Sequence, residues 1–323
     1  MKPQLVTVIG GTGFIGRYVV QELVKSGYNV QVISRKAHRG ANLQPLGYQN
    51  KVIYRRGDIT NPRTMQEYLA GSFAVINLVG ILFEKRKQRF SAIHAQCPER
   101  LAKVSKEMGV QHFVHISALG ADKAVQSVYA RSKGTGEKAV MAAFPLATIF
   151  RPSVVFGAED NFFNQFACMS RFSPFLPLIG GGKTLFQPAY VVDVAKAIVA
   201  SLSRKETQGK IYELGGSSTY SFRELMEFVV KTTGNKARLL TIPFPLAKMI
   251  GFLGEWMPRP ILTRDQVKLL QHDNLVQPER DGFTALTIKP TALEMVVPAY
   301  LQRFSRNPSS EQIVTTDPMK SAA

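Results

Sequence analysis

Cysteine, tryptophan, histidine and acidic residues are all scarce in this sequence. Its 323 residues include two cysteines, one tryptophan and five histidines, and its 23 acidic residues stand against 41 lysines and arginines. Two cysteines, Cys97 and Cys168, are too few for a disulfide framework and indicate a reducing compartment. The histidines are scattered and no Cys-x-x-Cys occurs, so the sequence predicts no metal site.

Long apolar runs are also missing. No stretch of about 18 apolar residues exists, so no membrane-spanning helix is expected. Residues 5–9 already read as a strand, which leaves no room for a signal or transit peptide before them. The sequence therefore predicts a cytosolic protein, or one bound peripherally to the cytosolic side of a membrane.

The excess of basic residues gives a net charge of +18 and an isoelectric point near 10. Such a charge favours an anionic partner, namely a phosphate cofactor, an acidic protein face or an anionic membrane surface. A solvated basic surface without a partner is the alternative. Nucleic acid is disfavoured because no helix-turn-helix, RNP or zinc pattern accompanies the charge.

Strand and helix patterns alternate through the first half of the chain. Apolar residues make up 45% of the sequence, which is enough for a sizeable core. The alternation predicts an α/β fold with a Rossmann-type, doubly wound parallel sheet. The expected strands are residues 5–9, 29–34, 51–55, 73–78, 111–117, 146–151 and later 211–214, and the expected helices include 14–25, 90–108 and 127–143.

The regular alternation of strand and helix patterns ends with the predicted nucleotide-binding domain (1–155). Residues 156–306 are predicted to form a smaller C-terminal α/β domain that faces a substrate or partner, while about 185–215 return to complete the first sheet. Residues 221–224 fit a capping box that opens a helix, and residues 307–323 are predicted to be a disordered tail.

A glycine-rich turn follows the first predicted strand and opens the first predicted helix. Its spacing, G-x-x-G-x-x-G, suits a tight turn, a close approach of the backbone to a pyrophosphate and the packing of helix on strand. The N-terminus of the helix would present free N–H groups to phosphate. We therefore predict a dinucleotide site, in preference to a purely structural turn, formed by Gly10, Gly11, Thr12, Gly13, Phe14, Ile15 and Gly16.

The choice of dinucleotide depends on the end of the second predicted strand. A carboxylate there would bind a ribose 2′-hydroxyl, whereas a cation would bind a 2′-phosphate. The sequence has Ser34, Arg35 and Lys36, and no acidic residue before Asp58. Because Arg35 can pair bidentately with phosphate, NADP(H) is preferred, with NAD(H) as second choice and a plain surface role for Arg35 as the alternative. Further cofactor contacts are expected from Asp58, Ile59, Leu78, Val79 and Gly80.

A serine, a tyrosine and a lysine are candidates for catalysis beside this cofactor. Tyr129 and Lys133 share one helix face because they are four residues apart, and Ser117 ends the fifth predicted strand. A nearby ammonium lowers the pKa of a phenol, which would suit Tyr129 to exchange a proton with a substrate oxygen. The alternative is that Tyr129 and Lys133 only bind the cofactor.

Together these residues resemble an atypical or extended short-chain dehydrogenase/reductase of the NAD-dependent epimerase/dehydratase type. This resemblance covers about residues 5–235 and includes segment 151–157, which implies cofactor contacts from Pro152, Ser153 and Val154. A closer likeness extends to about residue 303. It is to the NADP(H)-binding accessory subunit of respiratory complex I (NADH:ubiquinone oxidoreductase), often called the 39-kDa subunit, and it is carried by residues 151–164, 187–194, 242–246 and 261–267.

The closer likeness implies an accessory subunit that holds NADP(H) tightly and does not turn it over. It implies complex I subunits near the quinone site as partners. It also implies a bacterial relative that is peripheral on the cytoplasmic face of the inner membrane, or on the matrix side if mitochondrial. The apolar segment 244–257 would then lie in a membrane interface or against a partner, with Trp256 at headgroup depth, or else form an ordinary buried helix.

Two alternative functions accompany this prediction. The intact set of Ser117, Tyr129 and Lys133 favours a freestanding NADP(H)-dependent oxidoreductase or epimerase. Its substrate would be a small carbonyl compound, a sugar or a sterol- or isoprenoid-like molecule. A cofactor-sensing regulator without catalysis is the third function.

Overall fold

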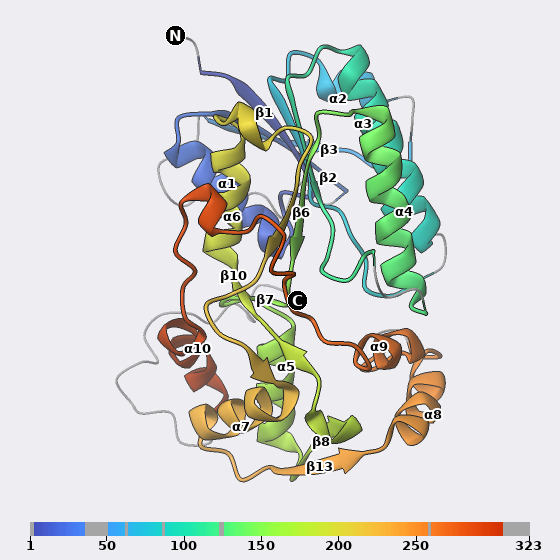
Figure 1. Cartoon of the computed structure of the whole chain (residues 1–323), viewed down its shortest axis with the longest axis vertical. Helices are drawn as coiled ribbons and strands as arrows, with labels where there is room; N and C mark the ends of the chain where they lie inside the picture. The colour runs from blue at the N-terminus through green and yellow to red at the C-terminus, as the bar shows by residue number, and fades with distance from the viewer. Residues whose placement is uncertain are drawn as a thin grey trace.

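A seven-stranded sheet, in which every neighbouring pair of strands is parallel, forms the larger part of the molecule (Figure 1). Its strand order is β11-β6-β5-β4-β1-β2-β3, so the order along the chain reverses between β1 and β4. The strands are β1 (Leu5–Ile9), β2 (Asn29–Ser34), β3 (Val52–Arg56), β4 (Ala74–Asn77), β5 (His112–Ile116), β6 (Thr148–Pro152) and β11 (Ile211–Leu214). This computed structural model describes residues 3–35, 51–61, 64–85, 88–122, 126–257 and 260–305.

Helices cover both faces of this sheet, which explains why β4 and β6 are buried at every position. On one face, α1 (Phe14–Lys25) packs against α6 (Val191–Ser201) (Figure 1). The other face carries α2 (Met65–Leu69), α3 (Cys97–Glu107) and α4 (Val128–Ala143). The predicted doubly wound Rossmann-type fold is therefore confirmed.

The helix expected over residues 90–108 has two parts. It opens as a π-helical turn, η3 (Ser91–Gln96), and continues as α3. Within η3, the His94 ring accepts a hydrogen bond from the Ile81 N–H, and the His94 carbonyl lies directly against Gly136 of α4. The π-helical turn η3 thus lies where the chain packs against α4. Helical periodicity in the sequence does not reveal such a tertiary contact, so it could not predict this turn.

The chain beyond residue 155 adds a smaller α/β unit, drawn below the sheet in Figure 1. The predicted capping box is present in it, because Ser221 and Glu224 each accept the backbone N–H of the other. The short strands are β7 (Val155–Phe156), β8 (Phe175–Ile179), β9 (Leu185–Phe186), β10 (Ala189–Tyr190), β12 (Tyr220–Ser221) and β13 (Arg238–Ile242). Its helices are α5 (Phe162–Phe172), α7 (Phe222–Thr233), α8 (Phe244–Gly254), α9 (Arg264–Leu269) and α10 (Leu293–Leu301), with 3-10 turns η4 (Gly180–Gly182) and η7 (Gln302–Phe304). Two other 3-10 turns belong to the larger part, where η5 (Lys205–Thr207) bonds to β6 and η6 (Thr284–Leu286) packs against α6.

Segment 244–257 was predicted to be either a helix exposed to a membrane or partner or an ordinary buried helix, and the burial of α8 distinguishes the two. Its buried residues are Ala247 and Gly251. In contrast, Met249 is 57% exposed, Leu253 63% and the following Trp256 83%. The ordinary buried helix is therefore wrong, and α8 lies on the surface with an apolar face outward. Among the described residues, no helix is long and apolar enough to cross a bilayer.

Candidate functional site

The glycine-rich turn lies between β1 and α1, next to the point where the sheet order reverses. Gly10 has a φ of +85°, which favours glycine, and its N–H donates to the Ile33 carbonyl at 3.0 Å. A side chain on Gly16 would overlap the Gly10 carbonyl oxygen. The first turn of α1, which is described in full, holds no acidic residue, and Gly13 brings no side-chain cap. The N–H groups at this helix end can therefore serve a phosphate.

The turn meets the segment that follows β4. A Cβ on Gly10 would stand 3.2 Å from the Val79 side chain, and a Cβ on Gly80 would stand 3.3 Å from the Lys133 ammonium. The structure thus brings the glycine turn, the end of β4 and Lys133 to one edge of the sheet. This edge is the usual place for a dinucleotide in an open α/β sheet.

The end of β2 is tied to the same turn. The hydroxyls of Thr12 and Ser34 are hydrogen-bonded at 2.8 Å. Arg35 follows and is exposed. With the Gln88 amide turned so that its oxygen faces Arg35, that oxygen accepts from the Arg35 guanidinium. Lys36, the third residue predicted for this position, lies outside the described residues.

Asp58 and Ser153, two further predicted cofactor contacts, also have polar atoms that are hydrogen-bonded within the protein. One carboxylate oxygen of Asp58 accepts the N–H and the hydroxyl of Thr60, at 2.9 and 2.8 Å. The Ser153 hydroxyl donates to the Asn274 side chain at 2.6 Å. These internal hydrogen bonds therefore hold the loops in which Asp58 and Ser153 lie. The other predicted contacts stand at or just after strand ends in the same sheet, and they are Ile59, Leu78, Pro152 and Val154.

Helix α4 carries Tyr129 and Lys133. Lys133 is buried and its ammonium donates to the Ile116 carbonyl at 3.1 Å. Burial lowers the pKa of Lys133 to about 8, against the opposing effect of Glu137. Burial raises the pKa of Tyr129 to about 12. The predicted lowering of this phenol pKa is wrong in direction, because the Lys133 ammonium is bonded to Ile116 and burial dominates at Tyr129.

Two polar groups near the end of β5 are buried and have no hydrogen-bond partner among the described residues, the Ser117 hydroxyl and the Nε2 of His115. The Asn77 amide oxygen accepts the Val79 N–H, so its NH₂ donates to His115 Nδ1 at 3.1 Å. The hydrogen of the neutral ring is then on Nε2. A buried polar group without a partner costs about 1–3 kcal/mol, so this donor set fits a polar ligand such as a nicotinamide dinucleotide.

His94 supports helix α4, and no spacing in the sequence pointed to it. Its Nε2 accepts the Ile81 N–H at 3.0 Å, so the hydrogen is on Nδ1, which lies 2.9 Å from the Ser132 hydroxyl. The His94 ring also meets the Tyr129 ring edge-on, with centroids 5.4 Å apart. Burial, with the Lys133 charge, lowers the pKa of His94 to about 2. His94 is therefore neutral and positions Tyr129.

Acidification should destabilise the protein through His94 and His115. Burial, with the Lys133 charge, lowers the pKa of His115 to about 3, far below the value of about 6.5 in an unfolded chain. The unfolded state then binds more protons. Stability is complete above pH 6.5 and falls with decreasing pH, by up to about 1.4 kcal/mol per unit for each histidine. Urea unfolding from about pH 7.5 to about pH 5 measures this slope, which should be flatter in His115→Asn. An equal slope in that variant would contradict the assignment.

A carboxylate from the smaller unit caps helix α4. The Ser127 hydroxyl donates to Asp265 at 2.8 Å, and the N–H groups of Val128 and Tyr129 donate to it at 2.8 and 3.0 Å. These bonds satisfy the open donors of the helix and place a negative charge at the positive end of its dipole. Helix α9 therefore fixes the start of the helix that carries Tyr129.

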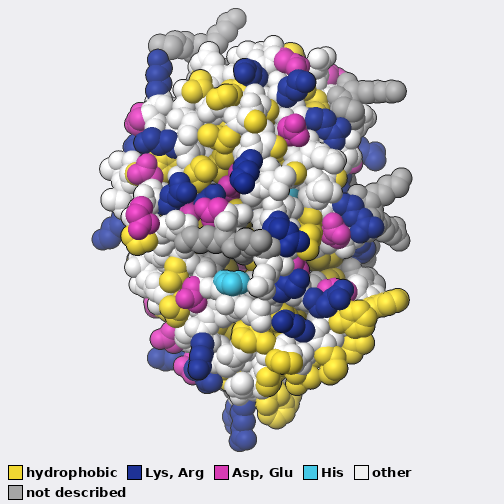
Figure 2. Space-filling model, turned by 45° about the vertical axis from the view of Figure 1, so that its right-hand side comes forward, with side chains coloured by type: hydrophobic (Ala, Val, Ile, Leu, Met, Phe, Trp, Pro, Cys, Tyr) yellow, Lys and Arg dark blue, Asp and Glu magenta, His cyan; other side chains and the backbone are white. Residues whose placement is uncertain are grey.

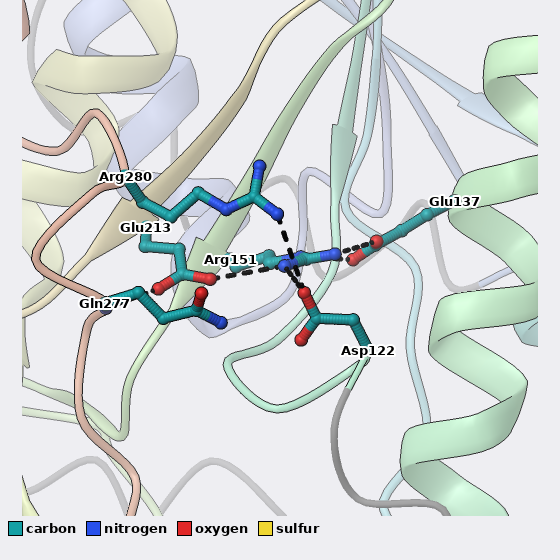
Figure 3. A network of polar contacts seen from close by, with 6 residues as sticks. All are labelled: Asp122, Glu137, Arg151, Glu213, Gln277 and Arg280. Carbon is teal, nitrogen blue, oxygen red and sulfur yellow. Dashed lines mark hydrogen bonds and ion pairs between the residues drawn. The ribbon is translucent and has the colours of Figure 1, made fainter.

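Arg151 joins three elements by ion pairs in the interior (Figure 3). Its side chain is 3% exposed and lies 2.6 Å from Asp122, 2.6 Å from Glu137 of α4 and 3.2 Å from Glu213 of β11. Although burial opposes it, hydrogen bonding to Glu137 raises the pKa of Arg151. Burial is likewise outweighed at Asp122, where the Arg151 hydrogen bond lowers the pKa. The network anchors α4 to the sheet.

The chain is similar to several known proteins over most of its length. Residues 6–215 match the NAD dependent epimerase/dehydratase family. The chain is 37% identical over 300 residues to NADH dehydrogenase (ubiquinone) 1 alpha subcomplex subunit 9, mitochondrial, of Arabidopsis thaliana, covering 89% of this chain and 75% of the relative. It is 33% identical over 318 residues to the same subunit of Mus musculus, covering 97% and 84%.

The fold is also similar to a solved structure, the dTDP-glucose 4,6-dehydratase of Streptomyces venezuelae with NAD bound. The TM-score is 0.71, and the match covers 93% of this chain and 96% of that chain. The sequences are 20% identical, so this likeness concerns the fold alone.

Proposed function

Because the chain belongs to the NAD dependent epimerase/dehydratase family, and within it to the family of the Arabidopsis and mouse complex I subunits, we propose that it is an NADP(H)-holding accessory subunit of respiratory complex I. The family resemblance predicted from the sequence is confirmed. The observation that carries the proposal is identity that continues through the smaller unit, since the mouse match covers 97% of this chain.

The residues described above would each hold one part of the dinucleotide. The glycine turn would bind the pyrophosphate, and Lys133 the ribose hydroxyls. Ser117 and His115 would satisfy their buried polar atoms on the nicotinamide side. When bound, NADP(H) can supply a hydride. A Tyr129 pKa of about 12 keeps the phenol protonated at neutral pH, so it can donate a hydrogen bond and is a poor base.

The preference for NADP(H) over NAD(H) rests on Arg35 and on the lack of an acidic residue between it and Asp58. A carboxylate at the end of β2 would repel a 2′-phosphate, whereas an exposed guanidinium can bind it bidentately.

We further propose that the subunit sits among complex I subunits near the quinone site, peripheral on the cytoplasmic face of the inner membrane. The net charge of +18 suits an anionic membrane surface or an acidic protein face. The exposed apolar face of α8, with Trp256 beside it, suits the interfacial depth of a membrane.

Purification from membranes in mild detergent, with release and identification of the bound nucleotide, tests the proposal. Co-migration with complex I and stoichiometric NADP(H) are the expected results. A free protein with exchangeable cofactor would overturn it. That result would favour the second candidate, an oxidoreductase or epimerase. The observation that favours this candidate is the buried Ser117 hydroxyl after β5, which has no hydrogen-bond partner among the described residues. A substrate screen with Tyr129→Phe as the inactive control would then follow.

The substitution Arg35→Asp should remove the preference for NADP(H). Losing a charge-assisted bond to the 2′-phosphate costs about 1.5–3 kcal/mol, which weakens NADP(H) binding about tenfold to a hundredfold. NAD(H) binding should change little, because its ribose lacks that phosphate. Titration of the released apo-protein with both nucleotides measures this, with Arg223→Asp on the distant α7 as the control. An unchanged ratio of the two affinities would contradict the role of Arg35.

A further inference from the structure

The smaller unit contains an apolar cavity, partly open to the surface, that is separate from the glycine turn and the Lys133 edge. Its volume is about 630 Å³, within the range of about 300–1,000 Å³ typical of ligand sites. It lies between α5, α7, α8 and α9, and two of its lining side chains are polar, Gln165 and Gln266. The apolar lining includes Phe162, Phe166, Met169, Ile250, Leu253 and Leu269.

The side chains that line the cavity in the described part of the chain offer hydrocarbon surface and no charged group. Gln266 uses its side-chain oxygen to accept the Thr263 N–H at 3.0 Å, as part of the capping box of α9. Water in such a space would find too few polar partners, and an empty space would leave the lining without dispersion contacts. The occupant that fits this lining is an apolar chain.

The cavity opens to the surface along α8. Ile250 and Leu253 line it, yet they are 40% and 63% exposed. Next to this opening Phe252 and Trp256 are exposed as well, and Figure 2 shows apolar side chains gathered at the lower right, bordered by lysine and arginine. Lys248 is exposed on the same helix. An apolar opening on a face that also carries lysine and arginine side chains suits an amphiphile with a polar or anionic head.

The walls of the opening are held in place by close backbone contacts. A Cβ on Gly251 would stand 2.8 Å from the Arg264 nitrogen, and one on Gly254 2.8 Å from the Leu262 carbonyl oxygen. Glycine therefore lets α8 pack tightly on the start of α9. Asp265, one residue on, is bonded to α4. A cavity with walls fixed in this way needs little ordering when it binds a ligand.

We propose that this cavity binds one hydrocarbon chain of a membrane amphiphile, inserted tail first, with the polar head at the surface opening along α8. The acyl tail of a phospholipid and the prenyl tail of a quinone share this chemistry. The inference goes beyond the proposed function and does not depend on it, because the cavity lies within this chain alone. Adsorption of α8 on a membrane surface would require only the exposed apolar face of the helix. It would not require the cavity behind α8.

Fluorescence of cis-parinaric acid, titrated into the delipidated full-length protein, measures the site. We expect saturable binding of one molecule per chain, displaced by saturated fatty acids more strongly as their length increases. Each methylene that enters the cavity should tighten binding by up to about fourfold, until the chain outgrows it. Displacement by dioleoylphosphatidylglycerol or by decylubiquinone then tells which source of the chain is preferred. Binding that does not saturate, or does not depend on chain length, would overturn the proposal.

Two matched double variants of α8 separate the cavity from the surface. Ile250→Gln with Leu253→Gln changes side chains that line the cavity, whereas Leu246→Gln with Met249→Gln changes exposed side chains that do not. The first pair should weaken binding at least about tenfold and the second less than about twofold. Equal weakening would mean surface adsorption and would refute the cavity site. Unchanged thermal melting in both pairs serves as the folding control.

Discussion

Replacing Arg151 by methionine should destabilise the protein by about 3–5 kcal/mol, because Glu137 and Glu213 would remain buried without their cation. Methionine keeps most of the volume, so the loss reports on charge and not on packing. Urea denaturation at neutral pH measures it. Loosening of α4, which carries Glu137, should also weaken nucleotide retention.

The matched control is Lys210→Met, which removes a cation from a half-exposed ion pair with Asp281 at 3.3 Å. Exposed pairs contribute less than about 1 kcal/mol, so its loss should be small. If Arg151→Met lowered the free energy of unfolding no more than Lys210→Met does, the buried network would not anchor α4.

Gly136→Ala should cost about 3 kcal/mol or more, although alanine is the better helix former by up to about 1 kcal/mol. A Cβ at this position of α4 would overlap the carbonyl oxygen of His94 in η3. Backbone cannot yield as a flexible side chain can, so α4 would have to move away, and Tyr129 and Lys133 with it. Thermal melting and retention of bound nucleotide should both decline.

Thr135→Ala is the control for this change. Thr135 neighbours Gly136 on α4 but is exposed, so its replacement should alter stability by less than about 0.5 kcal/mol. A Gly136→Ala variant as stable as Thr135→Ala would show that α4 and η3 do not approach so closely.

The sequence predicted best those strands and helices whose signals lie within a few neighbouring residues. The strands over 5–9 and 29–34 and the helix over 14–25 have the same bounds in sequence and structure. The reason is that alternation, helical periodicity and the glycine turn each depend on residues a few positions apart. The capping box of α7 is another local signal of this kind.

The parts of the site that were missed depend on distant residues. Asp265 caps a helix whose first residues lie 136 to 138 positions away, and His94 meets Ser132 at a separation of 38. Periodicity tells which face of a helix is buried but not which side chain it meets. The phenol pKa of Tyr129 was predicted in the wrong direction for the same reason, since the bond from Lys133 to Ile116 appears only in the folded chain.

The cap on α4 also decides how the protein matures during synthesis. The glycine turn, Tyr129 and Lys133 leave the ribosome early, but β11 and Glu213 follow later and Asp265 later still. A nascent chain that ends before Asp265 carries almost every residue of the proposed cofactor site, but it lacks the carboxylate that accepts the Val128 and Tyr129 N–H groups at the start of α4. The start of the helix that carries Tyr129 is therefore fully capped only after α9 has been synthesised.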